Sequence, residues 1–165
     1  MIACQLKDIK LFMNKLLNSE TFDKFSLETA RITTYNTFEI HGRTVPEFYN
    51  DLEEKPEVIP EFSLWRDMRP ICFGLIKGNR TPVSFQFTLR ADMDYTYRLI
   101  KQNEIDVDPA KVSCLFVNIR YEHGTLTCIT GTSFTTFVAD KSLETLWDTT
   151  FKKSLSAMNL NFEEM

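Results

Sequence analysis

Apolar positions in the first quarter of the chain follow the periods of short strands and one amphipathic helix. Over residues 2–6, apolar side chains recur at every second position, which predicts a strand with one buried face. Residues 9–17 carry apolar side chains three and four positions apart, directly after Asp8, a residue type that caps helices. Residues 25–42 are rich in Thr, Ile, Tyr and Phe, with a bend-forming Asn36 in the middle. That segment is predicted to be a β-hairpin.

Prolines and glycines mark the boundaries of the predicted elements in the middle of the chain. A start that resembles a capping box predicts a short helix over residues 46–53, and the Pro- and Glu-rich stretch that follows is typical of an exposed loop. We therefore expect a flexible insertion over residues 44–63. Proline is accepted in the first turn of a helix but not in its interior. Pro70 accordingly favours a helix over residues 70–77 that ends at Gly78.

The second half of the chain contains the clearest alternation. Residues 83–90 switch strictly between apolar and polar side chains, which predicts a strand with one face in the core and one in water. Asp92 can cap the amphipathic helix that follows. Strands are predicted over 115–121 and within 125–138, and a final helix over 142–156. The side chains predicted to face the core from the helix after Asp92 are Met93, Tyr97 and Ile100.

These elements predict an α+β fold in which amphipathic helices pack on a largely antiparallel sheet. A chain of 165 residues fits one domain, 1–165. The order strand, helix, strand, strand occurs over residues 2–41 and again over 82–131, so a duplicated unit is one alternative, although no residue-level repeat accompanies it. The side chains expected in a common core are Phe85, Phe87, Leu115, Val117, Ile119 and Trp147.

Composition and charge narrow the class of protein. The hydrophobic content of 43% and the fourteen Phe residues are ordinary for a globular protein. A net charge of −4 argues against a protein that coats nucleic acid or acidic membranes through its overall charge. No stretch approaches the roughly 20 apolar residues of a spanning helix, and Asp8 and Lys10 interrupt the start where a secretory signal needs an apolar run. We expect a cytoplasmic protein without membrane contact.

Residue types that serve catalysis or metal binding are present, but without the required spacing. The four cysteines form no CxxC pair and are Cys4, Cys72, Cys114 and Cys128. Three of them lie in apolar runs, so they are interpreted as buried structural thiols. His41 and His123 each stand next to a glycine and supply no zinc pattern. Nucleophile-elbow and phosphate-loop motifs are absent as well, and the acidic run over 51–61 is typical of a solvated loop. We expect neither a metal nor a cofactor.

Basic side chains are the candidate anion- or nucleic-acid-binding residues. The first group lies on or beside the polar sides of the two amphipathic helices and consists of Lys7, Lys10, Lys15, Arg98 and Lys101. The second group begins with Arg66 and Arg69 and continues with Lys77 and Arg80. Converging cations would bind phosphate without reading bases. The alternatives are solvated helix faces and ordinary ion pairs.

Several short motifs look familiar as a set. They are ITTYNTF at 32–38, RP at 69–70, IKGNRTP at 76–82, NIRY at 118–121, TGTS at 130–133 and DKSLETLW at 140–147. Over nearly its whole length the chain resembles an uncharacterised family of stand-alone Firmicutes proteins, a domain of unknown function. The motifs are strand, turn and cap segments, so the resemblance implies no activity and no functional residues.

The order of elements is also similar to that of the processivity clamps, in which two βαβββ units form a domain whose helices face DNA. This likeness concerns order alone. The first unit lacks a clear third strand, a helical insertion covers about 44–77, and a helix is added at the C-terminus. We interpret the protein as a non-enzymatic binding or assembly module whose partner is another protein or a second copy, with weak DNA contact. A small cytoplasmic enzyme with an unrecognised pocket is the alternative.

Overall fold

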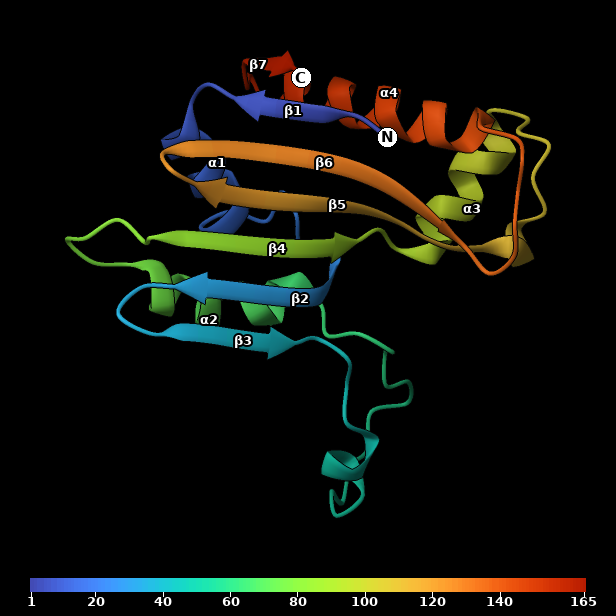
Figure 1. Cartoon of the computed structure of the whole chain (residues 1–165). Helices are drawn as coiled ribbons and strands as arrows, with labels where there is room; N and C mark the ends of the chain where they lie inside the picture. Colours follow the sequence, from blue (N-terminus) through green and yellow to red (C-terminus); the bar gives the residue numbers. More distant parts are fainter.

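A seven-stranded antiparallel sheet forms the body of the protein in the computed structural model, which describes residues 1–165 (Figure 1). The strands are β1 (Ala3–Leu6), β2 (Ser26–Thr33), β3 (Thr37–His41), β4 (Ser84–Arg90), β5 (Val112–Glu122), β6 (Thr125–Phe134) and β7 (Phe162–Glu164). Their order across the sheet is β3-β2-β4-β5-β6-β1-β7. The predicted α+β class with an antiparallel sheet is confirmed.

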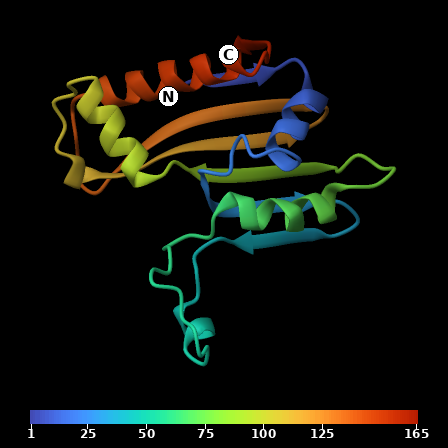
Figure 2. The same cartoon turned by 180° about the vertical axis from the view of Figure 1, so that it is seen from behind.

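Four α-helices cover one face of the sheet and leave the other face open (Figure 2). They are α1 (Ile9–Leu17), α2 (Trp65–Ile76), α3 (Met93–Gln102) and α4 (Ser142–Ala157), and two 3-10 turns are η1 (Pro46–Tyr49) and η2 (Pro109–Lys111). Asp8 caps α1 as predicted, because its carboxylate accepts a hydrogen bond from the Leu11 amide at 2.9 Å. No helix is long and apolar enough to cross a membrane.

The strict alternation along β4 explains how the sheet separates core from water. Phe85, Phe87 and Leu89 are buried under the helices, whereas the residues between them are only partly covered on the open face. All six residues predicted to share a core do so. Two buried indoles hold the helices in place. Trp65 Nε1 of α2 donates to the Leu16 carbonyl of α1 at 2.9 Å, and Trp147 Nε1 of α4 donates to the Phe116 carbonyl of β5 at 3.0 Å.

Two helix predictions require correction. α2 begins at Trp65 and not at Pro70, so Pro70 lies inside the helix. The helix begins early because the Trp65 side chain is fully buried and its amide donates to the Phe25 carbonyl at 2.8 Å. On α3, Ile100 is buried as predicted, but Tyr97 is exposed and Met93 only partly buried. The side chains that α3 buries are Thr96, Leu99 and Ile100.

Strand pairing separates the two halves that share an element order. β4 pairs directly with β5, whereas β1 and β2 are kept apart by β4, β5 and β6. Equivalent units would pair their strands in the same way, so the pairing argues against a duplicated unit. The strand after the turn at residues 123–124 ends at Phe134, and β7 was not predicted at all.

An arm formed by residues 44–61 projects from the body of the protein beyond β3 (Figure 1). Its two ends run side by side, because the Thr44 amide donates to the Glu61 carbonyl at 3.0 Å and Arg43 forms a bridge with Phe62. The predicted helix over 46–53 is reduced to the single turn η1. The arm lies within the range 44–63, and that this range is a flexible insertion stays a prediction.

Candidate functional site

The helix layer contains a cleft between its two halves, which we call the α3–α4 cleft. Its walls come mainly from three segments far apart in the sequence, with Leu64 added: residues 21–26, residues 91–98 at the start of α3, and residues 147–158 in the second half of α4 and its C-cap. The cleft has a volume of about 690 Å³, within the range of small-molecule binding sites.

The floor of the cleft is aromatic. Phe22, Trp147 and Phe151 are almost completely buried, and Tyr95 and Met158 are partly buried. The rings of Trp147 and Phe151 lie with centroids 6.0 Å apart, and the Trp147 indole is held by its bond to Phe116. The Tyr95 hydroxyl, whose pKa is raised by burial, is protonated at neutral pH as tyrosine ordinarily is and can donate a hydrogen bond.

Charged groups surround the mouth of the cleft, and most of them have no partner in the protein. Lys24, Asp92 and Arg98 line it and form none of the ion pairs of the chain. Asp23 is occupied, since both its oxygens accept from Arg69, at 2.8 and 3.1 Å. Two free cations and one free carboxylate therefore leave the mouth with a net positive charge.

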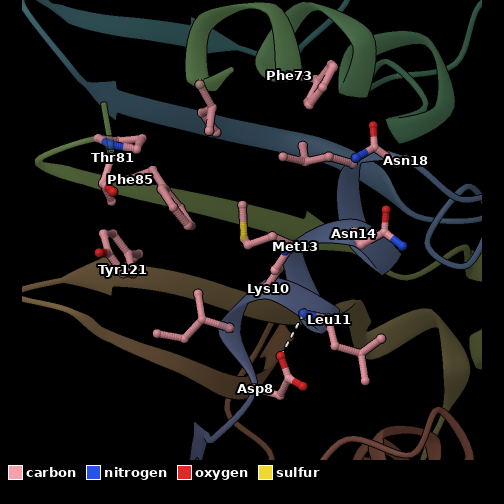
Figure 3. A pocket seen from close by; sticks show the side chains of 14 residues that line it. Asp8, Lys10, Leu11, Met13, Asn14, Asn18, Phe73, Thr81, Phe85 and Tyr121 are labelled. Atoms are coloured by element: carbon pink, nitrogen blue, oxygen red, sulfur yellow. Dashed lines mark hydrogen bonds between the residues drawn. The ribbon is translucent and has the colours of Figure 1, made fainter. Parts of the chain in front are cut away.

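A second hollow, the α1 groove, lies between α1, the end of α2 and the loop before β4, and has a volume of about 700 Å³ (Figure 3). Figure 3 shows Met13 of α1 above the sheet, with Phe85 and Tyr121 facing the same space. These two rings stack with centroids 5.1 Å apart. The polar rim includes Lys10 and Asn14, so the groove is an apolar trough open to water.

The structure does not bring the predicted basic residues together. Lys7 pairs with Glu163 at 2.6 Å, and Arg69 is held by Asp23, so both cations already have a carboxylate partner. Lys10 lines the α1 groove, whereas Arg98 lines the α3–α4 cleft. Both views place α1 and α3 at opposite ends of the helix layer (Figures 1 and 2). The remaining candidates are Lys15, Lys101 and Arg66, and the last lies 3.8 Å from Asp67.

The cysteines are buried and the histidines are exposed, so they do not form a catalytic pair of nucleophile and base. All four cysteines are free and buried, as predicted. Burial raises the pKa of Cys72 to about 12, so its thiol stays protonated and unreactive at neutral pH. His123 is 91% exposed in the turn between β5 and β6, and His41 is exposed at the end of β3. No group of three or more His, Cys, Asp or Glu side chains converges on a point.

Sequence patterns pointed to only one residue of the cleft mouth, Arg98. Asp92 was interpreted as a helix cap, but its side chain makes no capping hydrogen bond and stays free. No sequence pattern around Lys24 indicated a binding residue. No local signal could have found the cleft, since its three walls meet only through the sheet order.

Comparison with known proteins gives a family without an assigned function. A search of curated proteins and a search of solved structures find no match to the chain. Residues 15–163 match the family described as "family of unknown function (DUF5721)". The match covers the cleft and the arm, together with eight of the fourteen residues that line the α1 groove. The predicted resemblance to an uncharacterised single-domain family is confirmed, and the chain belongs to the family of unknown function DUF5721.

Proposed function

We propose that the protein is a binding module that holds a small organic anion with an apolar body in the α3–α4 cleft. One observation carries the proposal: a cleft of about 690 Å³ combines an aromatic floor with unpaired cations at its mouth. Binding sites for small molecules have this composition, a mostly apolar wall and a few polar groups that fix the orientation of the ligand.

The floor supplies the affinity for an apolar body. Phe22, Trp147 and Phe151 are packed in place by the core, so a ligand meets rings that are already ordered. Each methylene that leaves water for such a surface contributes about 0.8 kcal/mol. An acyl chain or an aromatic ring of ordinary size would therefore bind without any rearrangement of the sheet.

The mouth supplies the preference for an anion. Lys24 and Arg98 contribute two positive charges against the single carboxylate of Asp92. The guanidinium of Arg98 can form two parallel hydrogen bonds with a carboxylate or sulfonate. The protonated Tyr95 hydroxyl adds a neutral donor on the same helix.

The test uses 8-anilinonaphthalene-1-sulfonate, an aromatic anion whose fluorescence rises in an apolar site. We expect saturable binding of one molecule per chain, displaced by decanoate and much less by decylamine. Arg98→Glu should weaken binding about five- to tenfold, since one exposed charge contact is worth roughly 1 kcal/mol and the reversal adds repulsion. Lys101→Glu is the matched control, because Lys101 lies on the same helix but outside the cleft.

A second pair of variants tests the location of the site independently of charge. Ala157 lines the cleft from the end of α4, whereas its neighbour Ser156 is exposed and does not. Ala157→Phe should fill the cleft and abolish dye binding, and Ser156→Phe should leave it within about twofold of the wild type. Binding that decylamine and decanoate displace equally, or that survives Ala157→Phe, would contradict the proposal. Thermal melts of each variant establish that the fold is intact.

A further inference from the structure

We infer that the protein self-associates by docking the arm of one copy into the α1 groove of a second copy. This inference is independent of the α3–α4 cleft, which neither the arm nor the groove lines. It rests on three observations: unburied apolar side chains on the arm, an apolar groove without an occupant, and opposite charges on the two.

The arm exposes apolar side chains that the body of the protein does not cover. Its exposed large side chains are Val45 at 60%, Phe48 at 76%, Leu52 at 45% and Val58 at 79%. These are four of the eleven exposed large hydrophobic residues of the chain, gathered in a segment of about a tenth of its length. A concentration of this kind marks an interaction surface.

Phe48 is the natural anchor of the arm. It lies on η1, where its ring meets that of Tyr49 edge to face with centroids 5.4 Å apart. The single turn of 3-10 helix holds both rings at the distal part of the arm. Aromatic residues presented in this way dominate the binding energy of protein interfaces when they enter a pocket on the partner.

The α1 groove offers a complementary surface. Met13, Phe85 and Tyr121 line it together with Phe73 from α2 (Figure 3). A methionine adapts its shape to an aromatic ring and forms favourable sulfur–aromatic contacts. The stacked pair Phe85 and Tyr121 provides a flat surface for a third ring.

The charges on the two surfaces are opposite. The arm carries one cation, Lys55, and six carboxylates, a net charge of −5; the carboxylates are Glu47, Asp51, Glu53, Glu54, Glu57 and Glu61, of which only Glu61 has an ion-pair partner, Arg43. The groove carries Lys10 on its rim, and the loop that forms its far wall contains Lys77 and Arg80. These three cations take part in none of the ion pairs of the chain. Asp8, the only acid on the groove, is engaged in capping α1.

Geometry favours contact between two molecules over contact within one. The arm leaves the end of β3, whereas the groove lies beside the start of β4, at the opposite ends of the strands. Figures 1 and 2 both show the arm directed away from α1. Two copies that exchange arms form the same contact twice, which closes a twofold dimer.

Sedimentation velocity of the full chain tests the inference. We expect a dimer that forms with rising protein concentration and dissociates as salt is raised, because the rim contacts are exposed charges. Phe48→Asp should weaken association by about tenfold or more. Phe137→Asp is the matched control, since Phe137 is 91% exposed but lies outside the arm.

Charge reversal identifies which surfaces meet. One variant carries Lys10→Glu, Lys77→Glu and Arg80→Glu on the groove, and the other carries Glu47→Lys, Asp51→Lys and Glu54→Lys on the arm. Each variant alone pairs like charges and should be monomeric. An equimolar mixture restores opposite charges at both contacts and should form a heterodimer.

Two results would overturn the inference. The first is a wild-type chain that stays monomeric at low salt up to about 100 μM, a concentration at which a contact worth roughly 5.5 kcal/mol or more would be detected. The second is a dimer that survives Phe48→Asp, or a mixture of the charge-reversed variants that stays monomeric. Circular dichroism melts of each variant distinguish loss of association from loss of fold.

Discussion

Two glycines of this chain, Gly42 and Gly74, differ in the space available for a side chain. At Gly42, where the chain leaves β3, an added Cβ would lie 1.7 Å from the Leu27 carbonyl oxygen, closer than any contact allows. The Gly42 amide donates to Glu28 and its carbonyl accepts from Ser63, each at 2.8 Å, so the backbone cannot move away. Gly74 lies on an exposed part of α2, where an added Cβ would meet nothing within 4 Å.

Alanine at these two positions should therefore change stability in opposite directions. Gly42→Ala should lower the free energy of unfolding by about 2–4 kcal/mol, because the clash is with the backbone and can be relieved only by separating the base of the arm from β2. Gly74→Ala should raise it by about 0.5–1 kcal/mol through helix propensity. Urea melts measure both values. A Gly42→Ala variant as stable as the wild type would show that the close approach does not occur.

Residue burial was predictable where a strand alternates strictly and less so on a helix. The core residues of β4 and β5 were predicted because period 2 leaves only two choices of face. On α3 the predicted stripe contained Tyr97, but the structure buries Thr96 instead. A buried threonine is acceptable there because its hydroxyl donates to the Asp92 carbonyl at 3.0 Å, a bond that hydrophobicity patterns do not register.

At the scale of elements, α2 departs most from a sequence rule. Proline at the sixth position of a helix removes one amide hydrogen bond and crowds the carbonyl four residues earlier, that of Arg66. The helix nevertheless extends five residues before Pro70, because the buried Trp65 fixes its first turn against Phe25 and Leu16. Tertiary contacts have overridden the local preference.

Pro70→Ala should stabilise the protein by about 1–2 kcal/mol. Removing the proline relieves a penalty of up to about 3 kcal/mol for proline in a helix interior. The greater freedom of the unfolded chain lowers the stability by about 0.4–1 kcal/mol. The side chain is exposed, so no packing is lost. Pro109 provides the control, because it is the first residue of η2, where a backbone amide would have no hydrogen-bond partner within the turn in any case. Pro109→Ala should be neutral or slightly destabilising in the same urea melts, and an equal effect at both positions would contradict the explanation.

At the scale of the whole molecule, the element types could be predicted but their arrangement could not. Periodicity identifies a strand within its own segment, whereas the order β3-β2-β4-β5-β6-β1-β7 depends on pairings between distant segments such as β1 and β6. The candidate site follows from that order. Residues 21–26, Asp92 and Trp147 meet at one cleft only because β2, β4 and β6 are placed in one sheet.

The same arrangement determines how the protein would meet nucleic acid. The basic residues of α1 and α3 lie at opposite ends of the helix layer (Figure 2). Three of the seven candidates are already paired with carboxylates: Lys7, Arg66 and Arg69. The arm adds a net charge of −5, the sum of six carboxylates and one lysine. A duplex on the helix side would therefore contact few free cations at once.

We predict that binding of duplex DNA is weak, sensitive to salt and independent of sequence, because separated lysines and arginines contact phosphate alone. Fluorescence anisotropy at about 50 mM salt is the measurement, since phosphate contacts are strong enough to detect there. Replacing Lys10, Lys15 and Arg98 together with Glu should abolish binding without loss of stability. The control changes Lys111, Lys141 and Lys153 to Glu, exposed residues outside α1 and α3, and alters net charge equally. If both triple variants lose binding to the same extent, the overall charge of the protein governs DNA binding and the residues of α1 and α3 do not. A preference among DNA sequences would also contradict the prediction, because it requires base contacts that these cations do not provide.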